Sequence, residues 1–296
     1  MWTPQGETKL TFAAMGTLVT ASWQSTPEVA DDLRMRLPQR AEKLEDDLSR
    51  FRPKSPVNCL GTEWMNVGPH CAAVFNAAKY WSQRTEGFFK LFPRLSLDAE
   101  TLQLRGEQAR LTDSSGMRHL DLGGIAKGYA AAQLASLIQE SGGRNILVSF
   151  GGSSIVSLER RSTIKVQSPW QGSEFLGNLQ IENESLSVSA LPLTEVVPGL
   201  VQSHIYGLDG RLAFTDICAA VVVGFDAMGC EALSTALIAG GTPLLRNLTQ
   251  KGILGEAYRA LAMTSNGRVF SDPALELCIT EDLPEPLPLG SAEAAL

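Results

Sequence analysis

Cysteine and histidine are scarce in this chain, and neither is arranged as a metal-binding motif. The five cysteines, Cys59, Cys71, Cys218, Cys230 and Cys278, form no CxxC pair, and their odd number argues against a disulfide framework. None of the three histidines has a second histidine or a carboxylate at metal-ligand spacing. We therefore expect free thiols in a reducing compartment and no zinc site.

Long apolar runs and an excess of positive charge are also missing. No stretch reaches the roughly 18 apolar residues that a membrane-spanning helix needs. The N-terminal segment lacks the basic start and apolar run of a signal peptide. The net charge of -7 gives no general attraction for nucleic acid or anionic membranes. We expect a cytoplasmic protein without a nucleic-acid partner, although an exported form whose signal has been removed stays open.

The composition is that of a globular protein in which strands and helices are mixed. Hydrophobic residues make up 44% and charged residues 19% of the 296 residues. We see no internal repeat and no interior linker. The sequence therefore predicts an α+β fold with a mixed β-sheet core and flanking helices. We expect one domain over residues 1–282, followed by a frayed tail over 283–296 that is rich in Pro, Glu and Ala.

Periodicity and capping signals predict the main elements. Thr26 and Pro27 have the pattern of a helix start, and Pro38 is expected to kink or break the helix that runs on to Leu48. Other helices are predicted at Cys71–Thr85, Ile125–Ser141 and Ala227–Ala239, the last stopped by Gly240-Gly241. Strands are predicted at Leu10–Trp23 (interrupted at Met15-Gly16-Thr17), within Leu95–Thr112, and at Arg118–Leu122, Asn145–Phe150, Ser162–Gln167, Leu179–Ser189 and Cys218–Phe225.

A glycine pair between a predicted strand and a predicted helix is the first candidate site. The segment reads Asp121-Leu122-Gly123-Gly124-Ile125-Ala126-Lys127-Gly128-Tyr129. Glycines let a ligand approach the backbone, and the N–H groups of a first helical turn attract phosphate. Lys127 adds a positive charge, and Asp121 could bind a ribose or base edge. The spacing matches neither GxxxxGK[ST] nor GxGxxG, so a plain tight turn stays open beside phosphate binding.

Two weaker candidates lie further along the chain. Glu231 and Thr235 are four residues apart and share a helix face, so their oxygens could hold a hard cation such as Mg²⁺. A capping Glu and a Thr that bonds back to its own helix are the alternative. His204 lies just before a turn and is either structural or a general base.

Taken together and in this order, several segments resemble the FAD:protein FMN transferases, the ApbE-like proteins. They span most of the chain: Met15-Gly16-Thr17, Leu48 to Ser55, Gly87-Phe88-Phe89, Asp121 to Tyr129, Phe150-Gly151-Gly152, His204-Ile205 and Ala232 to Leu237. Members of that family use Mg²⁺ to cut FAD, pass its FMN half to a threonine of a partner flavoprotein, and release AMP. The resemblance implies the same substrate, cation and kind of acceptor for this chain.

The resemblance also implies roles for individual residues. Met15, Phe51, Phe88 and Phe89 would line the flavin or adenine pocket. Asp121 and Lys127 would contact FAD, and Ile205 would border it together with His204, our candidate base. The Gly124 carbonyl, Glu231 and Thr235 would hold the cation.

The chain departs from the family pattern mainly at polar positions. The family has Asp where Lys90, Ala132, Ser153 and Glu231 stand here, and further departures fall at Gly61, Val188-Ser189-Ala190 and Tyr206-Gly207-Leu208. The longer Glu231 either folds back and still binds the cation or misses it. Two further hypotheses therefore stay beside the transferase: a weakened FAD-binding or FAD-hydrolysing variant, and a flavin-free scaffold.

Overall fold

A long, mostly antiparallel sheet organises the chain. The computed structural model describes residues 6–95, 99–117, 119–170, 175–191, 205–213, 215–279 and 286–289. In these ranges the large sheet has the order β1-β2-β6-β7-β10-β11-β12-β13-β15. Only β13 and β15 pair in parallel. The strands are β1 (Glu7–Ala14), β2 (Thr17–Gln24), β6 (Arg144–Phe150), β7 (Ser154–Leu158), β10 (Ser185–Ala190), β11 (Ile217–Gly224), β12 (Tyr258–Thr264), β13 (Val269–Ser271) and β15 (Leu287–Pro288).

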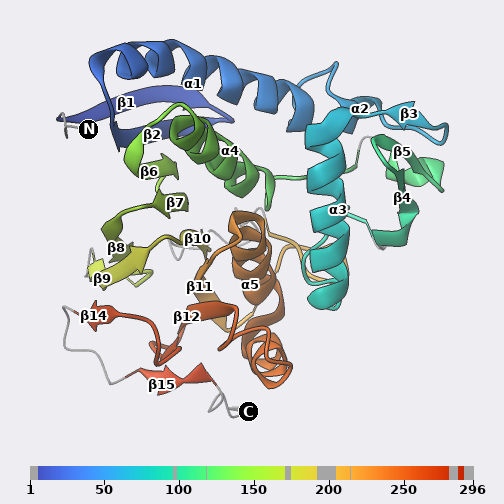
Figure 1. Cartoon of the computed structure of the whole chain (residues 1–296). Coiled ribbons are helices and arrows are strands. Elements are labelled where there is room, and N and C mark those ends of the chain that lie inside the picture. Colours follow the sequence, from blue (N-terminus) through green and yellow to red (C-terminus); the bar gives the residue numbers. More distant parts are fainter. Residues whose placement is uncertain are drawn as a thin grey trace.

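Helices cover one face of this sheet and a small sheet covers the other. Helix α4 (Ala126–Glu140) packs on β6 and β7, α5 (Ala227–Gln250) packs on β10 and β11, and the two helices contact each other (Figure 1). The small sheet has the order β14-β9-β8, with β8 (Arg161–Gln167), β9 (Phe175–Glu182) and β14 (Leu277–Ile279). Strand β11 lies between two hydrophobic clusters, which explains its uninterrupted apolar sequence. The expected α+β class with flanking helices is confirmed.

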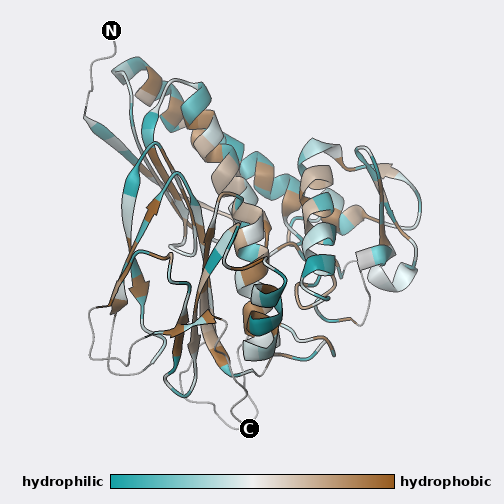
Figure 2. Cartoon of the chain, turned by 60° about the horizontal axis from the view of Figure 1, so that its bottom comes forward, coloured by the Kyte–Doolittle hydropathy of each residue, from teal (hydrophilic) through white to brown (hydrophobic). Residues whose placement is uncertain are grey.

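Peripheral helices complete the helical layer. Helix α1 (Pro27–Leu48) packs on β1 and α4, and α3 (Gly68–Arg84) packs on α5. Beyond α3 lies a third sheet of β3 (Met65–Asn66), β5 (Gln108–Leu111) and β4 (Leu102–Arg105), with the short α2 (Pro56–Cys59) beside it (Figure 1). Hydrophobic residues gather in the central strands and form stripes along the helices (Figure 2). No helix in the described ranges is both long and apolar enough to cross a membrane.

The expected helix start at Thr26 is confirmed, but Pro38 does not break α1. The Thr26 side chain accepts a hydrogen bond from the Val29 N–H, and Pro27 is the first helical residue. The helix continues to Leu48 because the side chains on either side of Pro38, Leu37 and Ala41, are fully buried. Burial of this apolar stripe outweighs the roughly 3 kcal/mol that an interior proline costs.

Two predicted strands are wrong. Residues 119–122 form no strand, because the Asp121 N–H bonds to the Leu91 carbonyl and the Asp121 carboxylate accepts from the Gly123 N–H, which turns the chain. The single strand predicted at Leu179–Ser189 is two strands, β9 and β10, in different sheets. The chain reverses between them at Asn183, which has a φ of 54° and tolerates the left-handed region.

The end of α5 and the C-terminal segment also differ from the prediction. Gly241, with φ 63° and ψ −162°, interrupts α5 where a stop was expected, but helical turns resume and continue to Gln250. The Asp216 carboxylate accepts from the Thr242 N–H and hydroxyl and so supports this restart from a distant part of the chain. In the expected tail, β15 pairs with β13 and Leu289 is buried; 283–285 and 290–296 lie outside the described residues. The assignment of 1–282 to one domain stays a prediction.

All five cysteines are free thiols, as expected. Cys71, Cys218 and Cys230 are buried, and burial raises the pKa of the Cys71 thiol to about 12 and that of Cys218 to about 11. These thiols therefore stay protonated at neutral pH and act as small apolar side chains.

Helices α4 and α5 approach each other closely at Gly128. A β-carbon at this position would lie 2.5 Å from the Ala227 carbonyl oxygen. We predict that Gly128→Ala lowers the free energy of unfolding by about 1–3 kcal/mol, although alanine is intrinsically the better helix former. Chemical denaturation measures this. Gly61→Ala, whose added carbon would meet only the Met117 methyl at 3.9 Å, is the matched control. Equal stability of both variants would contradict the tight contact.

Candidate functional site

A cleft of about 760 Å³ opens where the sheet, α4 and α5 meet the loops that follow α1 and α3. This volume is in the range of small-molecule sites, which is about 300–1,000 Å³. The lining residues come from eight segments: Arg50 and Phe51; Phe88 to Lys90 with Pro93 and Arg94; Asp121, Gly123, Gly124 and Lys127; Gly151 to Ser153; Gln167; Ser187 to Ala190; Ile205 and Tyr206; and Glu231 with Thr235.

The structure brings nearly all of the predicted site residues together in this cleft. They are Phe51, Phe88, Phe89, Asp121, Gly124, Lys127, Ile205, Glu231 and Thr235. His204 lies outside the described residues, so its role stays a prediction. Met15 does not line the cleft. Its φ is 51°, its N–H donates to a Glu45 carboxylate oxygen at 2.8 Å, and its side chain packs against the core.

The Met15-Gly16-Thr17 motif instead supports the cleft from behind. It forms the turn between β1 and β2, and Thr17 begins β2. A β-carbon at Gly151 would lie 2.4 Å from the Thr17 hydroxyl oxygen, and Gly151 has a φ of 61°. Thr17 therefore fixes the Gly151-Gly152 turn that lines the cleft.

The glycine turn presents the start of α4 to the cleft. Ile125 precedes the helix, its side chain makes no capping hydrogen bond, and no acidic residue lies in the first turn. Lys127 in this turn donates to the Gly123 carbonyl at 3.2 Å. The positive end of the helix dipole and the Lys127 ammonium thus point to the same side, which suits an anionic group.

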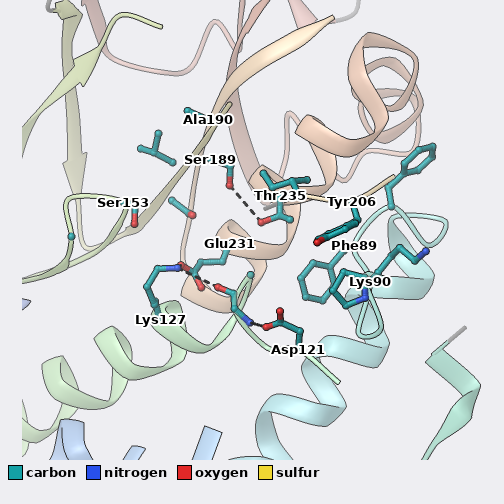
Figure 3. A pocket seen from close by; sticks show the side chains of 18 of the residues that line it. Phe89, Lys90, Asp121, Lys127, Ser153, Ser189, Ala190, Tyr206, Glu231 and Thr235 are labelled. Atoms are coloured by element: carbon teal, nitrogen blue, oxygen red, sulfur yellow. Dashed lines mark hydrogen bonds and ion pairs between the residues drawn. The ribbon is translucent and has the colours of Figure 1, made fainter. Parts of the chain in front are cut away.

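Glu231 is almost fully buried at the floor of the cleft. Only 4% of its surface is exposed, and its Oε1 lies 3.7 Å from the Lys127 Nζ (Figure 3). The Ser154 hydroxyl donates to the same Oε1. The second oxygen, Oε2, is buried and has no hydrogen-bond partner among the described residues. Such an oxygen costs about 1–3 kcal/mol unless a ligand binds it.

Hydroxyl groups of β10 and α5 continue from Glu231 along the same wall. Ser234 lies between Ser187 (3.1 Å) and Ser189 (2.9 Å), and Ser189 approaches the Thr235 hydroxyl at 3.5 Å (Figure 3). Thr235 is also close to the glycine turn, because a β-carbon at Gly124 would lie 3.2 Å from the Thr235 Oγ1. The glycine turn at Gly124, the Thr235 hydroxyl and the Glu231 carboxylate therefore lie in one corner of the cleft.

This corner has the donor set for a hard cation. Among the residues that the structure describes, no group of three or more His, Cys, Asp and Glu side chains could hold a metal. Mg²⁺, however, is commonly held by only one or two carboxylates together with water and substrate phosphates. The unpartnered Oε2 of Glu231 fits that mode of binding, and Thr235, one helical turn further along α5 and close to Gly124, could add a hydroxyl oxygen.

The cleft is richer in cations than the protein as a whole. Among the described residues, four cationic side chains line it, Arg50, Lys90, Arg94 and Lys127, against two acidic ones, Asp121 and Glu231. A net charge of -7 is thus combined with a locally positive cleft, which favours an anionic ligand.

Three of these cations were not predicted as site residues, and each is fixed by a neighbour. The Arg50 Nε lies 3.0 Å from an Asp121 carboxylate oxygen. The Lys90 Nζ donates to the Leu208 carbonyl at 3.0 Å, and burial lowers the Lys90 pKa, against the opposing effect of the Asp209 carboxylate. The Arg94 Nε lies 3.0 Å from the Tyr206 hydroxyl. These partners are far away in sequence, so spacing carries no signal for them.

Aromatic rings border the cleft. Phe51 is 77% exposed and lies under the Arg50 guanidinium, 4.3 Å from the ring centre. Phe89 is buried, and its N–H donates to the Thr85 hydroxyl at 3.0 Å, which fixes the turn after α3. Together with Phe88 and Tyr206, these rings provide apolar faces suited to a planar ligand.

Known structures share this architecture. A flavin transferase ApbE from Vibrio cholerae has a TM-score of 0.73 at 18% identity, covering 94% of this chain and 97% of that one. The ApbE protein from Thermotoga maritima has a TM-score of 0.77 at 17% identity, covering 90% and 97%. The apo form of the Pseudomonas stutzeri flavinyl transferase ApbE has a TM-score of 0.76 at 16% identity, covering 92% and 96%.

The sequence itself gives the more specific relationship. No curated protein matches this chain. The model of the ApbE family matches residues 15–93 and 90–255, which include every motif that suggested this family from the sequence. The match extends over more than half of the chain, and on this ground the protein belongs to the ApbE family.

Proposed function

We propose that this protein transfers FMN from FAD to a threonine of a partner flavoprotein, with Mg²⁺, and releases AMP. The observation that carries the proposal is the corner formed by Lys127, Glu231 and Thr235, where the cleft-lining Glu231 keeps one buried carboxylate oxygen without a partner among the described residues. Membership of the ApbE family and the similarity to the flavin transferases of Vibrio cholerae and Pseudomonas stutzeri support the same chemistry.

The diphosphate of FAD is the group that this corner suits best. Lys127 and the start of α4 would neutralise and orient it, as helix starts do for phosphate. Phe51, Phe88 and Tyr206 would contact the ring systems at either end. Asp121 is already bonded to Arg50 and to the Gly123 N–H, so its main role would be to hold the turn in shape.

The residues for the cation would be Glu231, Thr235 and the Gly124 carbonyl. A bound Mg²⁺ would supply charge neutralisation at the phosphates and so ease departure of AMP. Lys127, close to Glu231, would keep the same region positive from the side of α4.

The transfer itself needs a hydroxyl and a base. The acceptor threonine oxygen would form a bond to the FMN phosphorus while the bond from that phosphorus to the bridging oxygen breaks. AMP leaves with that oxygen, and the hydroxyl proton passes to a base, for which His204 remains our candidate. The cleft would hold the phosphate and hydroxyl in line, which is the larger part of catalysis in phosphoryl transfer.

A weakened FAD-binding variant is the second candidate. The observation that favours it is Lys90, which stands where the family has a carboxylate and whose ammonium is already bonded to the Leu208 carbonyl. Such a protein would bind FAD in the same cleft and release neither AMP nor a modified partner.

The first prediction concerns binding. FAD should bind more tightly than riboflavin, because the diphosphate supplies much of the affinity. Lys127→Ala should weaken FAD binding by about 1.5–3 kcal/mol, the range of a charge-assisted hydrogen bond, and leave riboflavin binding nearly unchanged. Calorimetry with both ligands measures this. Lys43→Ala, an exposed lysine of α1 paired with Asp47, is the control. Equal affinity of the wild type for FAD and riboflavin would contradict the diphosphate site.

The second prediction concerns turnover. With FAD, Mg²⁺ and an acceptor flavoprotein, the acceptor should gain the mass of one FMN, and an equal amount of AMP should appear. Replacing the target threonine of the acceptor by valine should abolish the gain, and Glu231→Gln should suppress both products. Intact mass spectrometry and AMP chromatography give the readout. AMP with an unmodified acceptor would indicate a hydrolase, and bound FAD with neither product would indicate the binding variant.

A further inference from the structure

We propose that Ser154 is a positioning residue that engages one carboxylate oxygen of Glu231 and leaves the other to a ligand, and that this makes the site selective for Mg²⁺ over Ca²⁺. The inference rests on the proposed function in that it assigns the cation to Glu231. Ser154 begins β7, is 1% exposed, and does not itself line the cleft.

The two oxygens of Glu231 have different surroundings. The Ser154 hydroxyl donates to Oε1, and the Lys127 ammonium is 3.7 Å from the same oxygen. Oε2 is buried and has no partner in the described part of the chain. One oxygen is therefore engaged by the protein from two sides, and the other is left for a ligand.

The backbone of α4 restricts the rest of the side chain. A β-carbon at Gly128 would lie 3.1 Å from the Glu231 Cγ, so the extra methylene of glutamate occupies the space that Gly128 leaves. The contact between α4 and α5 therefore limits the space around the Glu231 side chain. Ser154 then sets the rotation of the carboxylate group by binding one oxygen.

This arrangement has a consequence for metal selectivity. Mg²⁺ requires near-octahedral geometry at about 2.0–2.1 Å, whereas Ca²⁺ takes 6–8 oxygens and accepts bidentate carboxylates. Because Oε1 of Glu231 is bonded to Ser154 and close to Lys127, only Oε2 would be free to bind a cation. Without the Ser154 hydroxyl, Oε1 becomes available as well, and the larger cation gains a second bond.

The test is a titration of both cations into the protein saturated with FAD, without acceptor. Ser154→Ala should weaken Mg²⁺ binding about 10–100-fold, as loss of a hydrogen bond to a metal ligand does, and Ca²⁺ binding much less. The Mg²⁺/Ca²⁺ affinity ratio should therefore fall. Ser157→Ala is the matched control: Ser157 is a fully buried serine of the same strand, and its hydroxyl bonds to Ser162 and to the Arg160 carbonyl. That variant should keep the wild-type ratio.

A second pair of variants separates positioning from general stability. In Glu231→Asp the carboxylate is one methylene shorter and moves away from Ser154, so adding Ser154→Ala should change the ratio no further. If Ser154→Ala does not fold, Ser154→Cys, which has a similar shape and a weak donor, gives the same comparison.

The outcomes separate this inference from the proposed function. If the wild type binds Mg²⁺ but Ser154→Ala behaves like Ser157→Ala, the positioning role is wrong and the proposed function stands. If the ratio falls but no FMN reaches an acceptor, the positioning role stands and the transfer is wrong. If the wild type binds neither cation, the metal site and the positioning role are both wrong.

Discussion

The close approach of α4 and α5 at Gly128 is the constraint on which the site depends. Without a side chain there, the helices touch, and Lys127 comes to lie beside Glu231 at the floor of the cleft. The same packing brings Gly124 next to Thr235. The sheet, the hydrophobic clusters and the surrounding loops complete a cleft whose chemistry is set by this one helix pair.

The polar floor of the cleft is costly for folding and useful for binding. Burial of a carboxylate with one oxygen unpartnered destabilises a protein, and an apolar residue at position 231 would avoid that cost. A ligand that binds the unpartnered oxygen would offset this destabilisation. The surplus of cations around the cleft, in a chain of net charge -7, is consistent with a ligand that brings negative charge.

Local signals in the sequence predicted much of the fold, and distant contacts explain most of what was missed. Thr26-Pro27 marked the start of α1, and the motif Asp121 to Tyr129 led to the cleft because its glycines and lysine are local to α4. The restart of α5 depends on Asp216, which lies across the fold from Thr242. Thr17 of β2 supports the turn at Gly151, and Ser154 of β7 binds Glu231 of α5. Both contacts join distant parts of the chain, so the periodicity of the sequence does not predict them. His204 lies outside the described residues, and its assignment rests on the sequence alone.

The proposed function requires the diphosphate of FAD and a divalent cation to meet at Glu231. Two ligands that share a site raise each other's affinity by the same factor, and such coupling is typically about 1–3 kcal/mol. The most direct measurement is therefore calorimetry of FAD binding with and without Mg²⁺, in the wild type and in Glu231→Gln. We expect Mg²⁺ to tighten FAD binding in the wild type, to do so far less in Glu231→Gln, and not to affect riboflavin. Equal tightening in both proteins, or none in the wild type, would contradict it.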